Sequence, residues 1–319
     1  MPSFLPKVTR LGFSVAQALS PRLAGKLAFK LFCLTPGRRP KGERAKKIHT
    51  MGQERLREAE TFDLVIPGGA RAAAYRLNGG AKGRRKRYLV VHGWGSGSAY
   101  MSELIAALAG DGSEVVALDF PGHGSASGRF LHMGMAVKAI AAAEARFGAF
   151  DAAIGHSFGG AALMVSAAGL LPDVAQVLPG KLVLIGAPSR MRWLFVGLGK
   201  LLGLGAAAQA HFEAEILRVT GRRLEDFDMA HAGGCIRRPV LVVHAEEDKE
   251  VSADHAWAYA TGGDHVRLLW ANGFGHRRII AAHDVIAAIS DFLKQEPERP
   301  DGMMKIVPLF GLPGRRMSL

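Results

Sequence analysis

Residues 155–160 read Gly-His-Ser-Phe-Gly-Gly, and the short apolar run 150–154 precedes them. An Ala-rich segment follows, so the order predicts a strand that turns sharply into a helix at Ser157. Such a turn leaves no room for side chains on either flank of its central residue, and Gly155 and Gly159 meet that requirement. We therefore expect the Ser157 hydroxyl to project above the end of a sheet.

The chain has 319 residues, of which 49% are hydrophobic and 22% charged, as is typical of a globular protein with a large core. Its formal net charge of +13 is concentrated in residues 1–50, which hold 11 Lys/Arg and one acidic residue. Because the remaining chain is nearly neutral, we do not expect nucleic acid as a partner. Two cysteines, Cys33 and Cys235, predict no disulfide framework. Cations interrupt every apolar stretch near the start, so we expect no secretory signal and a cytoplasmic location.

Residues 1–50 form a basic, amphipathic, helical extension in our interpretation. Residues 4–19 place Leu11 and Val15 on an apolar face, and a second helix starts at Pro21 with Ser20 as its N-cap. The residues on one side of that helix are Leu23, Leu27, Leu31 and Leu34, beside a basic stripe of Arg22, Lys26 and Lys30. A Pro/Gly/basic linker follows over 36–47.

Three interpretations of this extension stay open: residues 4–34 contact an anionic membrane surface peripherally, they act as a targeting sequence, or they pack on the body or in a dimer. We favour packing.

From about residue 61, strands alternate with helices, which predicts an α/β fold with a mostly parallel sheet. The body comprises residues 51–188 and 233–296, the helical segment 189–232 is an inserted cap, and 297–319 form a loosely held C-terminal tail. The predicted strands are 62–66, 71–77, 87–91, 114–119, 150–154, 181–186, 239–244 and 265–270. The predicted helices are 98–109, 131–147, 158–169, 252–260 and 277–294.

A serine hydroxyl needs a base, usually a histidine oriented by a carboxylate, before it can act as a nucleophile at neutral pH. In chains with this kind of turn the order is serine, acid, histidine, with the acid and the histidine each after a later strand. Asp248 follows the run Val240–His244, and His276 follows the strand predicted over 265–270. Glu246 and Glu247 compete with Asp248 for the role of the acid, and Asp226 and Asp228 are weaker alternatives.

Five motifs now resemble those of the α/β-hydrolase superfamily, over roughly residues 60–294. They are His92-Gly-Trp-Gly95, Asp119-Phe-Pro-Gly-His-Gly124, the turn at Ser157, His244-Ala-Glu-Glu-Asp248 and Gly273-Phe-Gly-His276. The resemblance implies an α/β-hydrolase fold with an eight-stranded, mostly parallel sheet, flanking helices and one antiparallel strand. It also implies an oxyanion hole from the backbone N–H groups of Trp94 and Phe158.

We therefore expect a serine hydrolase that cleaves a small-molecule carboxylic ester through an acyl-enzyme on Ser157. An acyltransferase, a thioesterase or a carbon–carbon bond hydrolase is the alternative on the same residues, and a non-catalytic binding protein is a second one. Apolar side chains at Trp94, Trp193, Phe195 and Leu198 are the candidates for an acyl pocket. We expect no cofactor and no metal site, and the sequence does not predict the oligomeric state.

Overall fold

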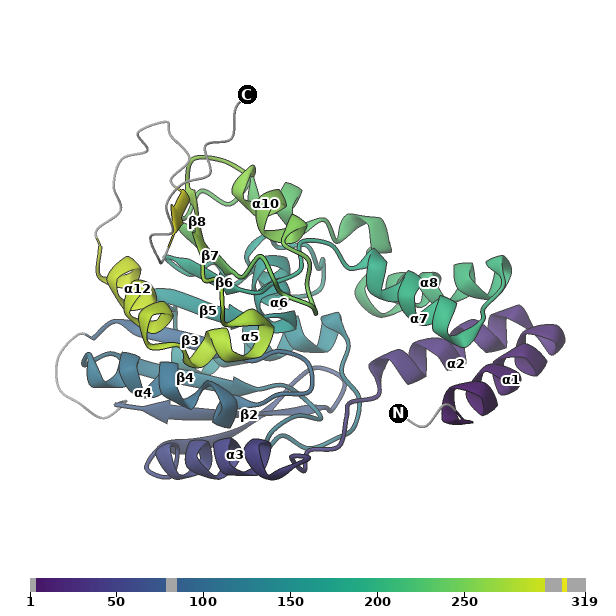
Figure 1. Ribbon diagram of the computed structural model, residues 1–319, viewed down its shortest axis with the longest axis horizontal. Helices are drawn as coiled ribbons and strands as arrows, with labels where there is room; N and C mark the ends of the chain where they lie inside the picture. Colours follow the sequence, from purple (N-terminus) through teal and green to yellow (C-terminus); the bar gives the residue numbers. More distant parts are fainter. Residues whose placement is uncertain (1–3, 79–84, 296–305, 309–319) are drawn as a thin grey trace.

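A single sheet with the strand order β1-β2-β4-β3-β5-β6-β7-β8-β9 forms the centre of the protein (Figure 1). The computed structural model describes residues 4–78, 85–295 and 306–308. The strands are β1 (Glu60–Val65), β2 (Arg71–Leu77), β3 (Arg87–Val91), β4 (Glu114–Asp119), β5 (Ala152–His156), β6 (Leu182–Ile185), β7 (Val240–His244), β8 (Val266–Trp270) and β9 (Ile306–Pro308). Strand β2 runs antiparallel to both of its neighbours, β1 and β4, and the other neighbouring strands of the described sheet pair in parallel. The predicted eight-stranded, mostly parallel sheet is confirmed by β1–β8.

The ninth strand is a difference from that prediction. Residues 306–308 pair in parallel with β8, which places them inside the segment 297–319 that we assigned to the tail. The other residues of that segment lie outside the described part of the chain. The edge of the sheet is therefore β9 and not β8.

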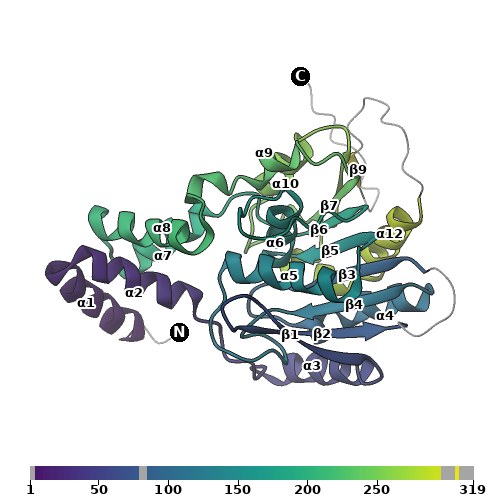
Figure 2. The same cartoon turned by 180° about the vertical axis from the view of Figure 1, so that it is seen from behind.

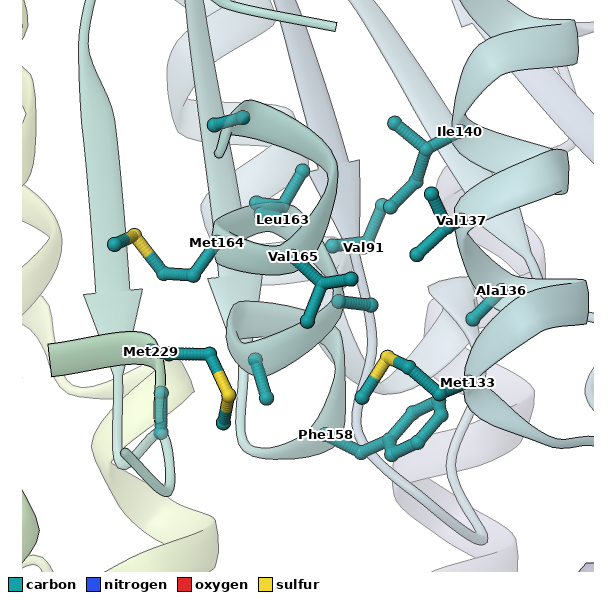
Figure 3. Close-up of a cluster of buried hydrophobic side chains, with 14 of the residues drawn as sticks. Val91, Met133, Ala136, Val137, Ile140, Phe158, Leu163, Met164, Val165 and Met229 are labelled. Atoms are coloured by element: carbon teal, nitrogen blue, oxygen red, sulfur yellow. The ribbon is translucent and has the colours of Figure 1, made fainter. Parts of the chain in front are cut away.

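The sheet is covered by helices on both faces, which explains why its central strands read as unbroken apolar runs. All residues of β4, β5, β6 and β7 are buried. On one face, α5 (Met133–Phe147) and α6 (Phe158–Ala167) pack together, and Figure 3 shows their side chains converging around Val91 of β3. On the other face, α4 (Ser102–Gly110) and α12 (His283–Lys294) cover a second apolar cluster.

Two helix predictions in the body need correction. The segment 277–294 is not one helix: α11 (Gly275–Arg278) and a 3-10 turn (Ile279–Ala281) precede α12, because Ala282 adopts an extended conformation with ψ 123°. The predicted helix at 98–109 likewise starts with a 3-10 turn (Ser98–Met101) before α4. The predictions for α5, α6 and α10 (Asp254–Ala260) are confirmed within two residues at each end.

Helix α3 (Glu43–Arg55) is absent from our predictions, which placed a linker over 36–47. It packs on α4 and on the 3-10 turn before it, and Arg55 pairs with Glu103 at 2.9 Å. A Cβ atom at Gly52 would overlap the carbonyl oxygen of Ala99, so glycine is what permits this close approach. Helix α3 also crosses residue 50, where we set the end of the extension, so we propose that α3 belongs to the body.

The N-terminal helices do not pack on the sheet. Helices α1 (Phe4–Leu19) and α2 (Pro21–Cys33) confirm the two predicted helices, and the Ser20 hydroxyl caps α2 by accepting a bond from Leu23 N–H. Helix α1 lies against α7 (Arg192–Leu202), and α2 lies against α7 and α8 (Ala206–Thr220); α7 and α8 come from the segment between β6 and β7. We call α1, α2, α7 and α8 the four-helix layer; it projects beyond one end of the sheet (Figures 1 and 2).

Aromatic rings hold the four-helix layer together. Phe29 and Phe32 of α2 lie 6.5 and 5.8 Å from the ring of Phe212 on α8, and Phe195 of α7 lies 4.7 Å from it. The Gln17 side chain of α1 donates to Gly203 O and accepts from Gly205 N, both in the turn between α7 and α8. The short helix α9 (Met229–Gly233) then leads back to β7. The extension thus packs on the segment that we predicted as the cap, but through Ala24, Gly25, Ala28, Phe29 and Cys33 of α2. The expectation that its leucine-bearing apolar face packs on the body is wrong, because those leucines are exposed.

Candidate active site

Ser157 occupies a strained turn between β5 and α6. Its φ of 51° and ψ of −121° are unusual for a residue other than glycine. A Cβ atom at Gly155 would lie 2.6 Å from the Cα of Gly160, and one at Gly159 would lie 2.5 Å from the carbonyl oxygen of His92. Both glycines are therefore required by the turn, as the sequence predicts. The Ser157 N–H donates to the carbonyl of Ile185 at 2.8 Å, which fixes the turn against β6.

The structure brings the three residues predicted for catalysis together at the carboxyl ends of the parallel strands. His276 Nε2 lies 3.1 Å from Ser157 Oγ, and His276 Nδ1 lies 2.7 Å from Asp248 Oδ2. Asp248 stands four residues beyond β7, and His276 stands in α11 just after β8. This order of contacts is that of a nucleophile, a base and an acid that orients the base.

Asp248 is held as a carboxylate. Burial by itself raises the pKa of Asp248, but the hydrogen bond with His276 and those from the backbone N–H groups of Val251 and Glu250 outweigh burial, and the pKa lies below its usual value. An ionised Asp248 accepts the Nδ1 proton of neutral His276. His276 Nε2 is then the acceptor, and the Ser157 hydroxyl is the donor.

Glu246 and Glu247, the alternatives to Asp248 as the acid, form hydrogen bonds with the loop after β8. Glu247 Oε1 accepts from the N–H groups of Gly273 and Gly275 at 2.6 and 3.0 Å. Glu246 exchanges hydrogen bonds with the side chain of Asn272 in both directions. These bonds join the loop after β7 to the loop after β8, and among the described residues the carboxylate hydrogen-bonded to His276 is that of Asp248. Asn272 is a residue that sequence reasoning missed, because a bond between two loops has no local signature.

The weaker rivals lie elsewhere. Asp226 accepts from the backbone N–H of Arg223 at 2.8 Å, and Asp228 pairs with Arg190 at 3.0 Å. Asp226 therefore stabilises a local turn, and Asp228 joins the two ends of the segment between β6 and β7.

Trp94 and Phe158, whose backbone N–H groups are predicted to form the oxyanion hole, line the same cleft as Ser157. Within the described chain, neither of these N–H groups donates to a protein acceptor. The N–H of Phe158 opens the first turn of α6, where unpaired donors and the helix dipole favour a negative charge. The Trp94 side chain is 38% exposed and packs edge-on against the ring of Phe158 at 5.7 Å.

Two buried histidines brace the loop that carries Trp94. His123 Nε2 accepts from Gly95 N–H at 2.9 Å, and His92 Nε2 accepts from Phe120 N–H at 3.1 Å. An accepting ring nitrogen is unprotonated, so both histidines are neutral here. Burial lowers the pKa of His123 to about 4 and also lowers that of His92.

Two further histidines, His156 and His244, form hydrogen bonds to the backbone of the loops that carry His276 and Asp248. This role was not assigned to them from the sequence. His156 donates from Nε2 to the carbonyl of His276 at 2.9 Å, and its ring lies 4.8 Å from the His276 ring. His244 donates from Nε2 to the carbonyl of Val251 at 3.0 Å, which closes the turn around Asp248. Burial lowers the pKa of His156 to about 3.

A cleft of about 2190 Å³ opens above Ser157 and His276. All four residues predicted for the acyl pocket line it: Trp94, Trp193, Phe195 and Leu198. Helix α2 and its C-cap also contribute to the wall, with Leu31 and Phe32 of the helix and Leu34 of the cap. The lining is mostly apolar near the four-helix layer. Among the described residues, no three or more His, Cys, Asp or Glu side chains are grouped so that they could hold a metal ion.

Residues 88–289 match the sequence model of the alpha/beta hydrolase family. The chain belongs to this family. No match to a curated protein is found.

Several solved structures share the alpha/beta hydrolase fold with this chain. An esterase from Pyrococcus furiosus is 17% identical, with 82% of this chain and 97% of the other covered and a TM-score of 0.56. A carboxylesterase from Bacillus subtilis, described as naproxen esterase, is 13% identical over 79% and 99% of the two chains, with a TM-score of 0.56. An esterase from Rhodococcus sp. is 18% identical over 73% and 98%, with a TM-score of 0.55. At these identities the likeness concerns the fold alone.

Proposed function

We propose that the protein is a serine hydrolase that cleaves carboxylic esters through an acyl-enzyme on Ser157. The observation that carries the proposal is the continuous hydrogen-bonded path from Ser157 Oγ through the His276 ring to the Asp248 carboxylate. The strained turn at Ser157 supports it, because such strain is retained where a side chain must be held in one position. The esterases with the same fold agree with it.

In this mechanism His276 Nε2 takes the proton of Ser157 as Oγ attacks the substrate carbonyl carbon. Asp248 holds the imidazole by its Nδ1 proton and stabilises the charged ring. The backbone N–H groups of Trp94 and Phe158 stabilise the oxyanion of the tetrahedral intermediate. The charged His276 then gives its proton to the departing alcohol, which leaves an ester between the acyl group and Ser157.

Deacylation repeats the sequence with water. His276 takes a proton from the water, the resulting hydroxide attacks the acyl carbonyl, and Ser157 Oγ leaves with the proton returned by His276. The products are a carboxylic acid and a free enzyme. We further propose that residues 189–232 act as a cap whose apolar side chains, Phe195 and Leu198 among them, bind the acyl part.

A fluorophosphonate probe tests the nucleophile. We expect it to label the wild type and to leave Ser157→Ala unlabelled. The matched control is Ser166→Ala, since Ser166 lies on the same helix, is 1% exposed, and its hydroxyl has no hydrogen-bond partner. We expect this control to be labelled like the wild type. Labelling of Ser157→Ala at the wild-type level would reject Ser157 as the nucleophile, and an unlabelled wild type would favour a non-catalytic binding protein.

The reaction type needs a substrate panel. p-Nitrophenyl esters of increasing acyl length, the matching thioesters, and alcohols as acyl acceptors can be compared at equal concentration. We expect a higher kcat/KM for esters than for thioesters, and release of the free acid when acceptors are present. Preference for thioesters, or transfer to the alcohol, would assign the same residues to a thioesterase or an acyltransferase.

A further inference from the structure

Several large apolar residues of the N-terminal helices are exposed to solvent. Leu11 and Leu19 of α1 are 67% and 80% exposed, and Leu23 of α2 is 48% exposed. We define the leucine face as the large exposed apolar residues of these two helices and of the α2 C-cap: Leu11, Val15, Leu19, Leu23, Leu27, Leu31 and Leu34. Seven large apolar residues exposed on two consecutive helices form a surface that monomeric proteins seldom leave open to water.

The leucine face lies opposite the sides on which these helices pack. On α2 the buried residues are Ala24, Gly25, Ala28, Phe29 and Cys33, and they face α8. On α1, Gln17 is bound to the turn between α7 and α8, and Leu11 and Val15 lie on the other side of the helix. Folding the four-helix layer therefore leaves the leucine face outward, so the apolar stripe is not used by the internal packing of the described chain.

The charge around the leucine face has one sign. Residues 1–42 contain no Asp or Glu. Arg10, Arg22, Lys26 and Lys30 are all exposed on α1 and α2. Helix α7, which packs on α1, adds cations and has no acidic residue in its sequence. An apolar stripe bordered by cations matches the interfacial zone of an anionic lipid bilayer, where acyl chains lie beneath negative headgroups.

We propose that the leucine face is a docking surface for an anionic lipid bilayer. A second copy of the chain is the competing occupant. A two-fold dimer through this face would bring Arg22, Lys26 and Lys30 close to the same residues of the other copy, with no acidic residue in residues 1–42 to neutralise them. A bilayer carries the opposite charge instead. None of the described helices is long and apolar enough to span a membrane, so docking is by surface contact.

Docking on this face would also place the opening of the cleft next to the bilayer. Leu31 and Leu34, at the end of the leucine face, line the cleft above Ser157, together with exposed Trp193 and Leu201 of α7. An acyl chain that leaves the bilayer thus meets apolar side chains on its way to the serine. It follows that the substrate is an ester carried in the lipid, and this last step rests on the proposed function.

Vesicle sedimentation of the full-length protein tests the docking. The probes are vesicles of phosphatidylcholine alone and of an equimolar mixture with phosphatidylglycerol. We expect the wild type to sediment with the anionic vesicles and not with the neutral ones. Each cation near the surface contributes a factor of about 5 to 6, so the triple change Arg22→Gln, Lys26→Gln and Lys30→Gln should lower the partition coefficient on the order of 100-fold.

The leucine face is tested by Leu11→Asp, Leu19→Asp and Leu23→Asp together, none of which lines the cleft. We expect this triple variant to lose vesicle binding. The matched control is Leu178→Asp, a leucine that is 37% exposed and lies just before β6, at the opposite end of the sheet from Ser157. It should bind like the wild type, and thermal unfolding checks that each variant is folded.

The outcomes separate docking from catalysis. Ser157→Ala should bind vesicles like the wild type, so loss of hydrolysis leaves the docking proposal intact. Equal binding of the wild type and the triple leucine variant, or no binding of the wild type to either vesicle, would reject the bilayer. A dimer in analytical ultracentrifugation that the triple leucine variant abolishes, without vesicle binding, would assign the face to a second copy.

Discussion

Replacing Phe212 by alanine should release the N-terminal helices from the rest of the protein. Phe212 is fully buried at the centre of the four-helix layer, and its ring packs on those of Phe29, Phe32 and Phe195. Truncation of a buried phenylalanine costs about 3–5 kcal/mol of unfolding free energy, to which each lost ring pair contributes about 0.5–1.5 kcal/mol beyond its buried area. Two of the three ring pairs join α8 to α2, so most of the loss should fall on that contact.

Hydrogen exchange followed by mass spectrometry measures this loss locally. A loss of about 3 kcal/mol at the α2–α8 contact corresponds to roughly 100-fold faster exchange of the α2 amides when they exchange by local opening. Phe150→Ala is the matched control, because Phe150 is a buried phenylalanine (3% exposed) just before β5 and has no ring contact with α2. This control should lower the global stability without selective exchange in α2. The reasoning would be refuted if the α2 amides of Phe212→Ala exchanged as slowly as those of the wild type. It would also be refuted if Phe212→Ala and Phe150→Ala accelerated the exchange of α2 equally.

Three further changes test other parts of the structure. Asp248→Asn removes the carboxylate that fixes the tautomer of His276, so kcat for ester hydrolysis should fall by about 10⁴ with a much smaller change in KM. If steady-state assays show that kcat falls by less than about tenfold, this role of Asp248 is contradicted. Gly52→Ala places a methyl group against the carbonyl of Ala99, so the urea midpoint should fall by an amount equivalent to about 1–3 kcal/mol, and an unchanged midpoint would show that α3 can shift freely. The pKa of His156 is about 3 in the folded protein, against 6.5 for an unperturbed histidine. The unfolded chain therefore binds more protons below pH 6.5, and the stability should decrease as the pH falls from 6.5 towards 4. A Tm that stays constant over this pH range would argue against neutral buried histidines.

The strands were predictable because their pattern is local. Central parallel strands are buried on both faces, so runs such as Val240–His244 stand out between glycines, prolines and charges. The positions of Ser157, Asp248 and His276 followed from those strands, since each residue lies just beyond a strand end. Strand β9 was not predicted, because three residues paired with a single neighbouring strand are too short to show a recognisable strand pattern in the sequence.

The missed features depend on contacts between distant segments. Helix α3 is mostly polar, and its closest contact is made by Gly52, which helix propensity disfavours. The leucines of α2 suggested an inward-facing side, but the packed side is made of alanine, glycine and phenylalanine, because small residues let α2 approach α8 closely. The bonds from Glu247 and Asn272 between two loops likewise require both loops to be in place.

The long sequence separation inside the four-helix layer has a consequence for biosynthesis. Gln17 bonds to Gly203 across 186 residues, and α2 packs on α8, which is also translated much later. At typical translation rates the two N-terminal helices wait roughly 10 to 40 s for their partners. During that time the aromatic side of α2 and the leucines on its other side are both uncovered on the nascent chain. The two helices are thus among the last elements to acquire their native contacts, and they are a natural target for chaperones that bind exposed apolar helices.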